Sequence, residues 1–132
     1  MVQFVGKYQL ERNENFIEFV QSLGQNLSPE MIEKLNSTKS IFEVAQDGDK
    51  YTFISHSGTS RPMTFKLGEE FAEETLGGLK LKTTAKQEGD KIVLSAVGGS
   101  QSGSRIYEFT KDGLITSFTA GDIVGKRYYK RL

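Results

Sequence analysis

The chain has 132 residues, enough for one domain with its own hydrophobic core. Its formal net charge is zero, which argues against a nucleic-acid-binding protein, because the affinity of such proteins rests mainly on neutralised phosphates. It contains no cysteine, which excludes a disulfide scaffold and a cysteine-based zinc site. No apolar run approaches the roughly 20 residues that span a bilayer, and residues 1–7 lack the pattern of a secretory signal, so we predict one soluble, cytoplasmic domain over residues 1–132.

The first part of the chain predicts a strand followed by a helix. Residues 4–10 alternate as a strand, with one face made of Phe4, Gly6, Tyr8 and Leu10. Asn13 is expected to cap the helix and Gly24 to end it. The apolar side of the helix repeats at the spacing i, i+3, i+4 and i+7 and consists of Phe16, Phe19, Val20 and Leu23.

A second short helix is expected directly after the first. Ser28 can cap it, and Pro29 then occupies the first helical position, where proline is tolerated. Its apolar side is Met31, Ile32 and Leu35. The two helices together predict a helix-turn-helix between the first strand and the remainder of the chain.

After residue 36 the helical pattern gives way to short strand-forming segments separated by turn residues such as Asp47-Gly48 and Gly89-Asp90. The predicted strands cover residues 40–45, 50–55, 62–67, 70–75, 79–87, 91–97, 105–110, 114–120 and 123–130. So many short strands without intervening helices exclude a parallel α/β sheet. They predict a mainly β fold, an up-and-down antiparallel barrel of ten strands, which can hold one small ligand.

The last predicted strand carries an anion-binding pair. Strand alternation places Arg127 and Tyr129 on one face, with Ile123 and Gly125. The guanidinium group offers a fork of hydrogen-bond donors, and the phenol adds one more. If this face points into a closed barrel, the pair becomes a clamp for a carboxylate inside an apolar cavity.

Several motifs, taken together, resemble the intracellular lipid-binding proteins, a family that includes fatty-acid-binding and cellular retinoic-acid-binding proteins. The motifs are Gly6-x-Tyr8-x-Leu10, Asn15-Phe16, Phe19-Val20 with Leu23, residues 65–71, 73–75 and 80–82, residues 119–124, and Arg127-Tyr-Tyr129. One position departs, because Ile17 stands where the family usually has an acidic residue. The resemblance covers the whole chain and implies a ten-stranded, clam-shaped, lipocalin-like barrel, capped by a helix-turn-helix and holding one lipid.

The resemblance also implies a head-group site. Arg127 and Tyr129 match the family's arginine and tyrosine that bind the ligand carboxylate. The family's usual third member, another arginine, is replaced here by Tyr107. Arg105 lies two residues earlier on the same strand face and could supply the missing charge. Which of the two completes the site remains open at this point.

Other positions are expected to line the cavity. The helix residues Phe16, Phe19, Val20 and Leu23 form core packing at the barrel mouth and, by resemblance, also touch the ligand tail. The resemblance also implies that Thr116 and Phe118 line the interior wall, with Ser55 as a weaker candidate. The family's portal aromatic has no counterpart in residues 57–62.

No catalytic or metal site is predicted. The glycines around residues 98–103 lack the lysine of a phosphate-binding loop and are interpreted as a hairpin turn. The only histidine, His56, is expected at the edge of a turn, without the oriented nucleophile and acid that a catalytic triad needs. The acidic pairs at 69–70 and 73–74 are interpreted as solvated surface charge.

The leading prediction is therefore a monomeric binding protein and not an enzyme. It would take a long-chain fatty acid as its ligand, with no other cofactor, and make transient contact with membranes or a membrane protein. Two alternatives remain open: binding of a retinoid such as retinoic acid, and lipid-dependent regulation of a membrane enzyme or transporter.

Overall fold

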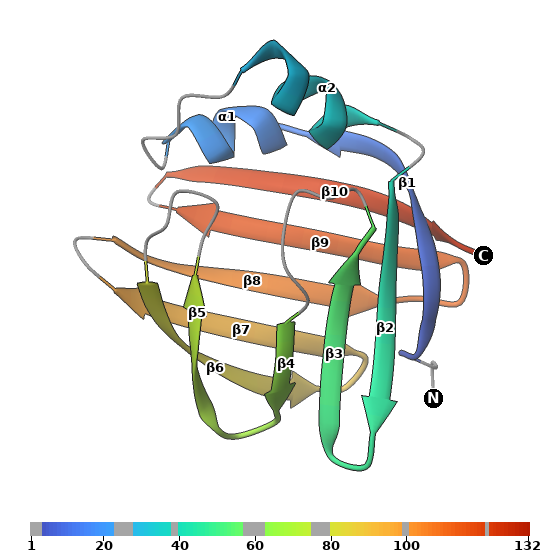
Figure 1. The fold of residues 1–132 in the computed structure, drawn as a ribbon, viewed down its shortest axis with the longest axis vertical. Coiled ribbons are helices and arrows are strands. Elements are labelled where there is room, and N and C mark those ends of the chain that lie inside the picture. Colours follow the sequence, from blue (N-terminus) through green and yellow to red (C-terminus); the bar gives the residue numbers. More distant parts are fainter. Residues whose placement is uncertain are drawn as a thin grey trace.

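A computed structural model describes residues 4–22, 28–37, 40–56, 63–74, 80–98, 101–120 and 122–132, which contain ten strands and two helices (Figure 1). In chain order these are β1 (Gly6–Glu14), α1 (Phe16–Ser22), α2 (Pro29–Asn36), β2 (Ile41–Asp47), β3 (Lys50–Ser55), β4 (Met63–Lys66), β5 (Glu70–Glu74), β6 (Lys80–Glu88), β7 (Lys91–Gly98), β8 (Gln101–Phe109), β9 (Gly113–Ala120) and β10 (Ile123–Arg131).

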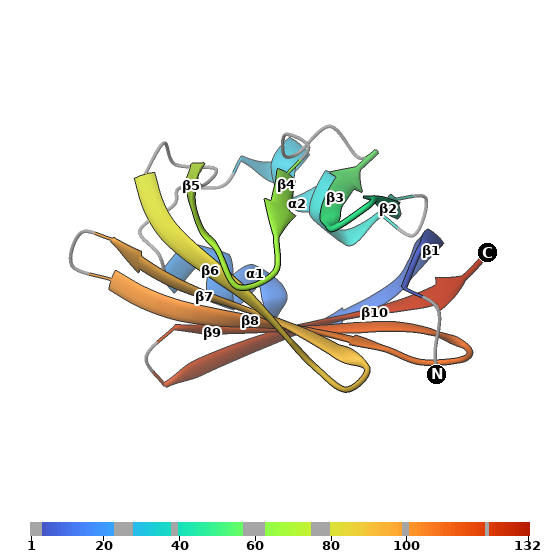
Figure 2. The same ribbon diagram turned by 90° about the horizontal axis from the view of Figure 1, so that it is seen from below.

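The strands form one antiparallel sheet in the order β4-β3-β2-β1-β10-β9-β8-β7-β6-β5. Neighbours in the sheet are neighbours in sequence, except where β1 pairs with β10 and joins the two ends of the chain. The sheet curls back on itself, so that β2–β5 lie opposite β6–β10 (Figure 2). Its two edges, β4 and β5, come close without a ladder between them in the described residues, which leaves a nearly closed barrel and confirms the predicted fold class.

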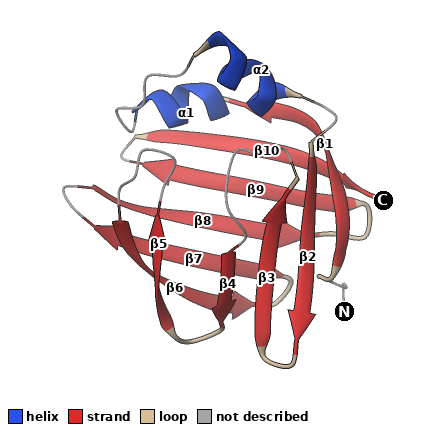
Figure 3. Ribbon diagram, viewed as in Figure 1, coloured by secondary structure: helices blue, strands red, loops and turns tan. Residues whose placement is uncertain are grey.

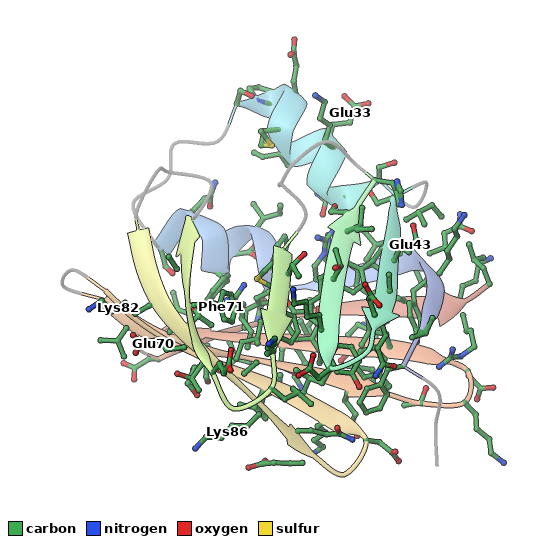
Figure 4. The ribbon with its side chains drawn as sticks, turned by 60° about the horizontal axis from the view of Figure 1, so that its bottom comes forward. Glu33, Glu43, Glu70, Phe71, Lys82 and Lys86 are labelled. Carbon is green, nitrogen blue, oxygen red and sulfur yellow. The ribbon has the colours of Figure 1, made fainter. Side chains whose placement is uncertain are left out.

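Alternate residues of each strand fill the interior. The core is largely aromatic: Phe4 stacks on Phe109 with ring centroids 4.4 Å apart, and Phe53 meets Tyr107 at 4.7 Å. Side chains crowd the space between the two layers, whereas Lys86 points away from it on β6 (Figure 4). Burial of these rings contributes to the stability of the barrel.

Both helices cover one end of the barrel (Figure 3). Phe16 and Phe19 of α1 form a second, smaller cluster with Phe118 and Ile123. Gly125 permits this close packing, because a Cβ atom there would lie 2.9 Å from the Cβ atom of Phe19. No helix among the described residues is long and apolar enough to cross a membrane.

The predicted start of the first helix was wrong. Asn13 does not cap it, because β1 continues to Glu14 through its ladder with β10. The turn into α1 falls on Asn15, which has a φ of 55° and whose carbonyl accepts a 3.0 Å hydrogen bond from the Phe19 amide. Asparagine tolerates this left-handed conformation better than most residues. The cap of α2 is confirmed, since the Ser28 hydroxyl accepts a bond from the Met31 amide.

Most strand boundaries agree with the predictions, and β3 agrees at both ends. The two largest differences are at β1, which ends at Glu14 and not at residue 10, and at β8, which begins at Gln101 and not at residue 105. Gly98 and Gln101 already face each other in the β7–β8 ladder, so the predicted loop is a much tighter hairpin. Leu23, Gly24 and residues 57–62 lie outside the described residues.

Candidate functional site

Strand β10 places Arg127 and Tyr129 on the interior face, as predicted. Gly125 and Tyr129 are buried, whereas Val124, just before Gly125, and Lys130, just after Tyr129, are exposed. The guanidinium carbon of Arg127 lies 4.4 Å from the ring centroid of Phe16 and 5.6 Å from that of Tyr129. Tyr129 is 8 % exposed, and this burial raises the pKa of its phenol, an effect that the nearby Arg127 partly offsets.

Asn13 is a functional candidate that the sequence analysis missed. Strand β1 contains a β-bulge between Leu10 and Arg12, which shifts the alternation by one residue. Asn13 therefore faces the interior, and its Oδ1 atom accepts a 3.0 Å hydrogen bond from Nε of Arg127. Arg12 is turned to the outer face, where its guanidinium carbon lies 3.8 Å from the ring centroid of Tyr128.

Four interior polar residues form one row across neighbouring strands. Tyr107 of β8 is opposite Thr116 of β9, Thr116 is opposite Arg127 of β10, and Arg127 is opposite Asn13 of β1. We call Tyr107, Thr116, Arg127 and Asn13 the polar row. Neighbouring strands are about 4.8 Å apart, so the side chains of adjacent members can meet one ligand group.

The centre of the polar row has an unused hydrogen-bonding group. Thr116 is 2 % exposed, and its hydroxyl oxygen is buried without a hydrogen-bond partner among the described residues. An unsatisfied buried hydroxyl costs about 1–3 kcal/mol relative to a paired one. A ligand group or water that bonded to Thr116 would remove that cost.

The two candidates for the third head-group residue occupy different places. Tyr107 is buried in the polar row and contacts the rings of Phe42 and Phe53. Arg105 is half-buried and pairs with Phe118 and not with Thr116, one row nearer to α1. The structure therefore brings Tyr107, and not Arg105, into the same row as Arg127.

The structure brings together only some of the residues that were predicted to line the cavity. The rings of Phe16 and Phe19 lie 5.2 Å and 5.6 Å from that of Phe118, so these three residues form one aromatic surface beside Arg127. Ser55 is half-buried on β3, across from Phe42. The side chain of Val20 and the whole of Leu23 lie outside the described part of the chain.

The described residues give little support for a catalytic or a metal-binding site. His56 is exposed, and its Nε2 atom lies 2.8 Å from a carboxylate oxygen of Glu43 in a surface pair. Glu69 and Glu70 are exposed, and the side chains of the second acidic pair are outside the described set. No group of three histidine, cysteine or acidic residues in that set could hold a metal ion.

Comparison with known proteins supports the resemblance seen in the motifs. A model of the lipocalin / cytosolic fatty-acid binding protein family matches residues 2–132. The chain is 36% identical over 132 residues to a fatty acid-binding protein of Tyrophagus putrescentiae, with 99% of each chain covered.

Two solved structures are similar over nearly their whole length. One is a Schistosoma mansoni fatty acid binding protein in complex with arachidonic acid, with a TM-score of 0.85, 30% identity, and 98% of this chain and 96% of that chain covered. The other is a fatty acid-binding protein from brain tissue of Drosophila melanogaster, with a TM-score of 0.84, 38% identity, and 97% and 99% covered. This chain therefore belongs to the lipocalin / cytosolic fatty-acid binding protein family.

Proposed function

We propose that this protein binds a long-chain fatty acid inside its barrel and carries it between membranes in the cytoplasm. The carboxylate is held by Arg127 and Tyr129, and the acyl chain lies against the interior aromatic residues. Family membership and the fatty-acid-binding relatives support this class of ligand, as does the arachidonic acid complex of the Schistosoma mansoni protein. The protein acts as a monomer, without a further cofactor and without catalysing a reaction.

The observation that carries the proposal is the unpaired hydroxyl of Thr116 beside Arg127. A carboxylate has two oxygens and accepts several hydrogen bonds. It satisfies the Thr116 hydroxyl and the guanidinium group at the same time, and it receives a further bond from the Tyr129 phenol. Tyr107, on the other side of Thr116, completes the site from the polar row.

The acyl chain supplies most of the affinity. Each buried CH2 group contributes about 0.8 kcal/mol, so a long chain contributes far more than one charge-assisted hydrogen bond. The aromatic surface of Phe16, Phe19 and Phe118 offers apolar contact next to the head-group site. The carboxylate contacts mainly set the orientation of the lipid and select for an acid.

The test is a competition titration in which unlabelled lipids displace a fluorescent fatty acid from the purified protein. We expect oleate to displace the probe better than oleyl alcohol or methyl oleate, which lack the carboxylate charge. Equal displacement by all three lipids would contradict the carboxylate site. Stronger displacement by retinoic acid than by oleate would favour the retinoid alternative.

A lipid-dependent regulator is distinguished by a different measurement. Lipid transfer between donor and acceptor vesicles needs only transient contact with membranes, whereas a regulator requires a protein partner that binds the lipid-loaded form better. We expect transfer of a fluorescent fatty acid to proceed with pure lipid vesicles. Failure of transfer without added membrane proteins would favour the regulator.

A further inference from the structure

Asn13 links the interior arginine to the second helix. Its Oδ1 atom accepts the 3.0 Å hydrogen bond from Nε of Arg127, and its Nδ2 atom donates a 2.8 Å hydrogen bond to Oδ1 of Asn36. Asn36 is the last residue of α2. Two consecutive hydrogen bonds therefore connect the proposed carboxylate site inside the barrel with an exposed residue of the helical cap.

The first helix also touches the same arginine. The ring of Phe16, the first residue of α1, lies against the guanidinium group of Arg127, which gives a cation–π contact. Arg127 is thus connected to α1 directly and to α2 through Asn13.

A hydrogen bond that holds the helix in place should matter more for α2 than for α1. Among the described residues, α1 packs on β10 and β9, whereas α2 has few contacts with the strands and contributes Met31 to the apolar cluster of α1. A hydrogen bond at the end of a loosely packed helix has a larger effect on whether that helix stays in place than one within a tightly packed element.

We propose that Asn13 is a positioning residue that orients Arg127 and couples carboxylate binding to the position of α2. This inference rests on the proposed function. When a carboxylate binds Arg127, the guanidinium group is held in one orientation, which holds the Asn13 amide and, through it, Asn36. The coupling is reciprocal by linkage: a lid held by the acid must strengthen binding of the acid by the same factor.

The coupling predicts a difference between two ligands of similar chain length. Oleate engages Arg127 with its charge and therefore stabilises α2 through Asn13. Oleyl alcohol fills the interior with a similar chain but lacks the charge, so it stabilises α2 less. This difference separates the relay from a general stabilisation that any bound lipid would give.

The experiment measures amide hydrogen exchange of α2 in the full-length protein, saturated with oleate or with oleyl alcohol. In the wild type we expect slower exchange with oleate. Asn36→Ala should abolish this difference while keeping the fold, because Asn36 is exposed. Asn13→Ala should abolish it too and weaken oleate binding about fivefold to tenfold, with less than a twofold effect on oleyl alcohol.

The matched control loosens the same helix at its other end. Ser28→Ala removes the cap of α2 without touching Asn13 or Asn36. It should speed exchange with both lipids but keep the difference between them. If Ser28→Ala also abolished the difference, general loosening of α2 would explain the result and the relay would be wrong.

Failure of the relay can be told apart from failure of the proposed function. If the wild type prefers oleate, Arg127→Leu loses that preference, and Asn36→Ala retains the exchange difference, the relay is overturned and the carboxylate site stands. If the wild type itself does not distinguish oleate from oleyl alcohol in affinity, the carboxylate site fails as well. Under the relay, Asn13→Ala combined with Asn36→Ala should change exchange no further than either alone.

Discussion

Thr116 lies opposite Arg127 in the β9–β10 ladder, and its buried hydroxyl has no hydrogen-bond partner among the described residues. Valine has the same shape as threonine but no hydroxyl, so a valine would fill this buried position without an unsatisfied hydrogen-bonding group. The unpaired hydroxyl fits the proposed carboxylate site, in which a bound group would complete its hydrogen bonds.

Thr116→Val should raise the free energy of unfolding of the ligand-free protein by about 1 kcal/mol, because it removes an unsatisfied buried hydroxyl. The same change should weaken oleate binding about threefold to tenfold. Urea unfolding and the competition titration measure the two effects. Thr83→Val is the control, since Thr83 is also fully buried but already has a partner, and it should lower stability. Loss of stability in Thr116→Val with unchanged oleate affinity would contradict the assignment.

Arg127→Leu should weaken oleate binding by about 1.5–3 kcal/mol, because a charge-assisted hydrogen bond is lost. Binding of methyl oleate should change much less. Arg12→Leu is the matched control: Arg12 is on the neighbouring strand but faces outward, against Tyr128. If Arg12→Leu and Arg127→Leu reduced oleate affinity equally, the effect would be one of general charge and not of an interior site.

Tyr107→Phe should weaken oleate binding severalfold, whereas Arg105→Ala should have little effect, because Tyr107 and not Arg105 lies in the polar row. Both variants are compared with the wild type in the same competition titration. The reverse order would show that Arg105 supplies the charge that the family's missing arginine usually provides.

Tyr129→Phe should reduce the loss of stability at alkaline pH. Burial raises the pKa of the Tyr129 phenol above its ordinary value of 10.0. The unfolded chain then releases this proton at lower pH than the folded protein, so the contribution of Tyr129 to stability is complete below about pH 10 and falls as pH rises further.

Urea unfolding at pH 9 and pH 11 measures this effect. The wild type should lose more free energy of unfolding between these two values than Tyr129→Phe does. Tyr128→Phe, on the outer face, controls for the loss of a phenol in general. A variant with the same alkaline loss as the wild type would show that Tyr129 is not protected by burial.

Gly125→Ala should displace or destabilise α1, at a cost of about 1–3 kcal/mol, because the added methyl group would lie 2.9 Å from the Cβ atom of Phe19. Faster amide exchange confined to α1 would confirm the effect. Unchanged exchange in α1 would mean that the helix does not need glycine at this position.

Much of the fold follows from local patterns in the chain. The alternation of Val124, Arg127 and Tyr129 predicts which face of β10 is buried, and the motif Ser28-Pro29 predicts the start of α2. These signals are strong because strand period and helix capping depend on a few neighbouring residues. The same alternation places Arg127 and Tyr129 on this interior face.

The parts that could not be predicted depend on pairing between distant strands. The bulge after Leu10 is an extra residue in β1, and the sequence around it carries no signal for it. Because of this bulge, Asn13 faces Arg127 and Arg12 does not. Without the bulge, the sequence pattern predicts Asn13 as a helix cap. The place of Tyr107 in the polar row also required the register of β8, β9 and β10.

The most direct test of the central claim is carbon-13 NMR of oleate labelled at its carboxyl carbon, titrated with pH while bound to the protein. A carboxylate beside Arg127 should have its pKa lowered by about 1–3 units, so its signal should not titrate near pH 4, where an ordinary carboxyl group does. In Arg127→Leu the titration should return toward that range. A bound carboxylate that titrates near pH 4 in the wild type, and equally in Arg127→Leu, would contradict the account.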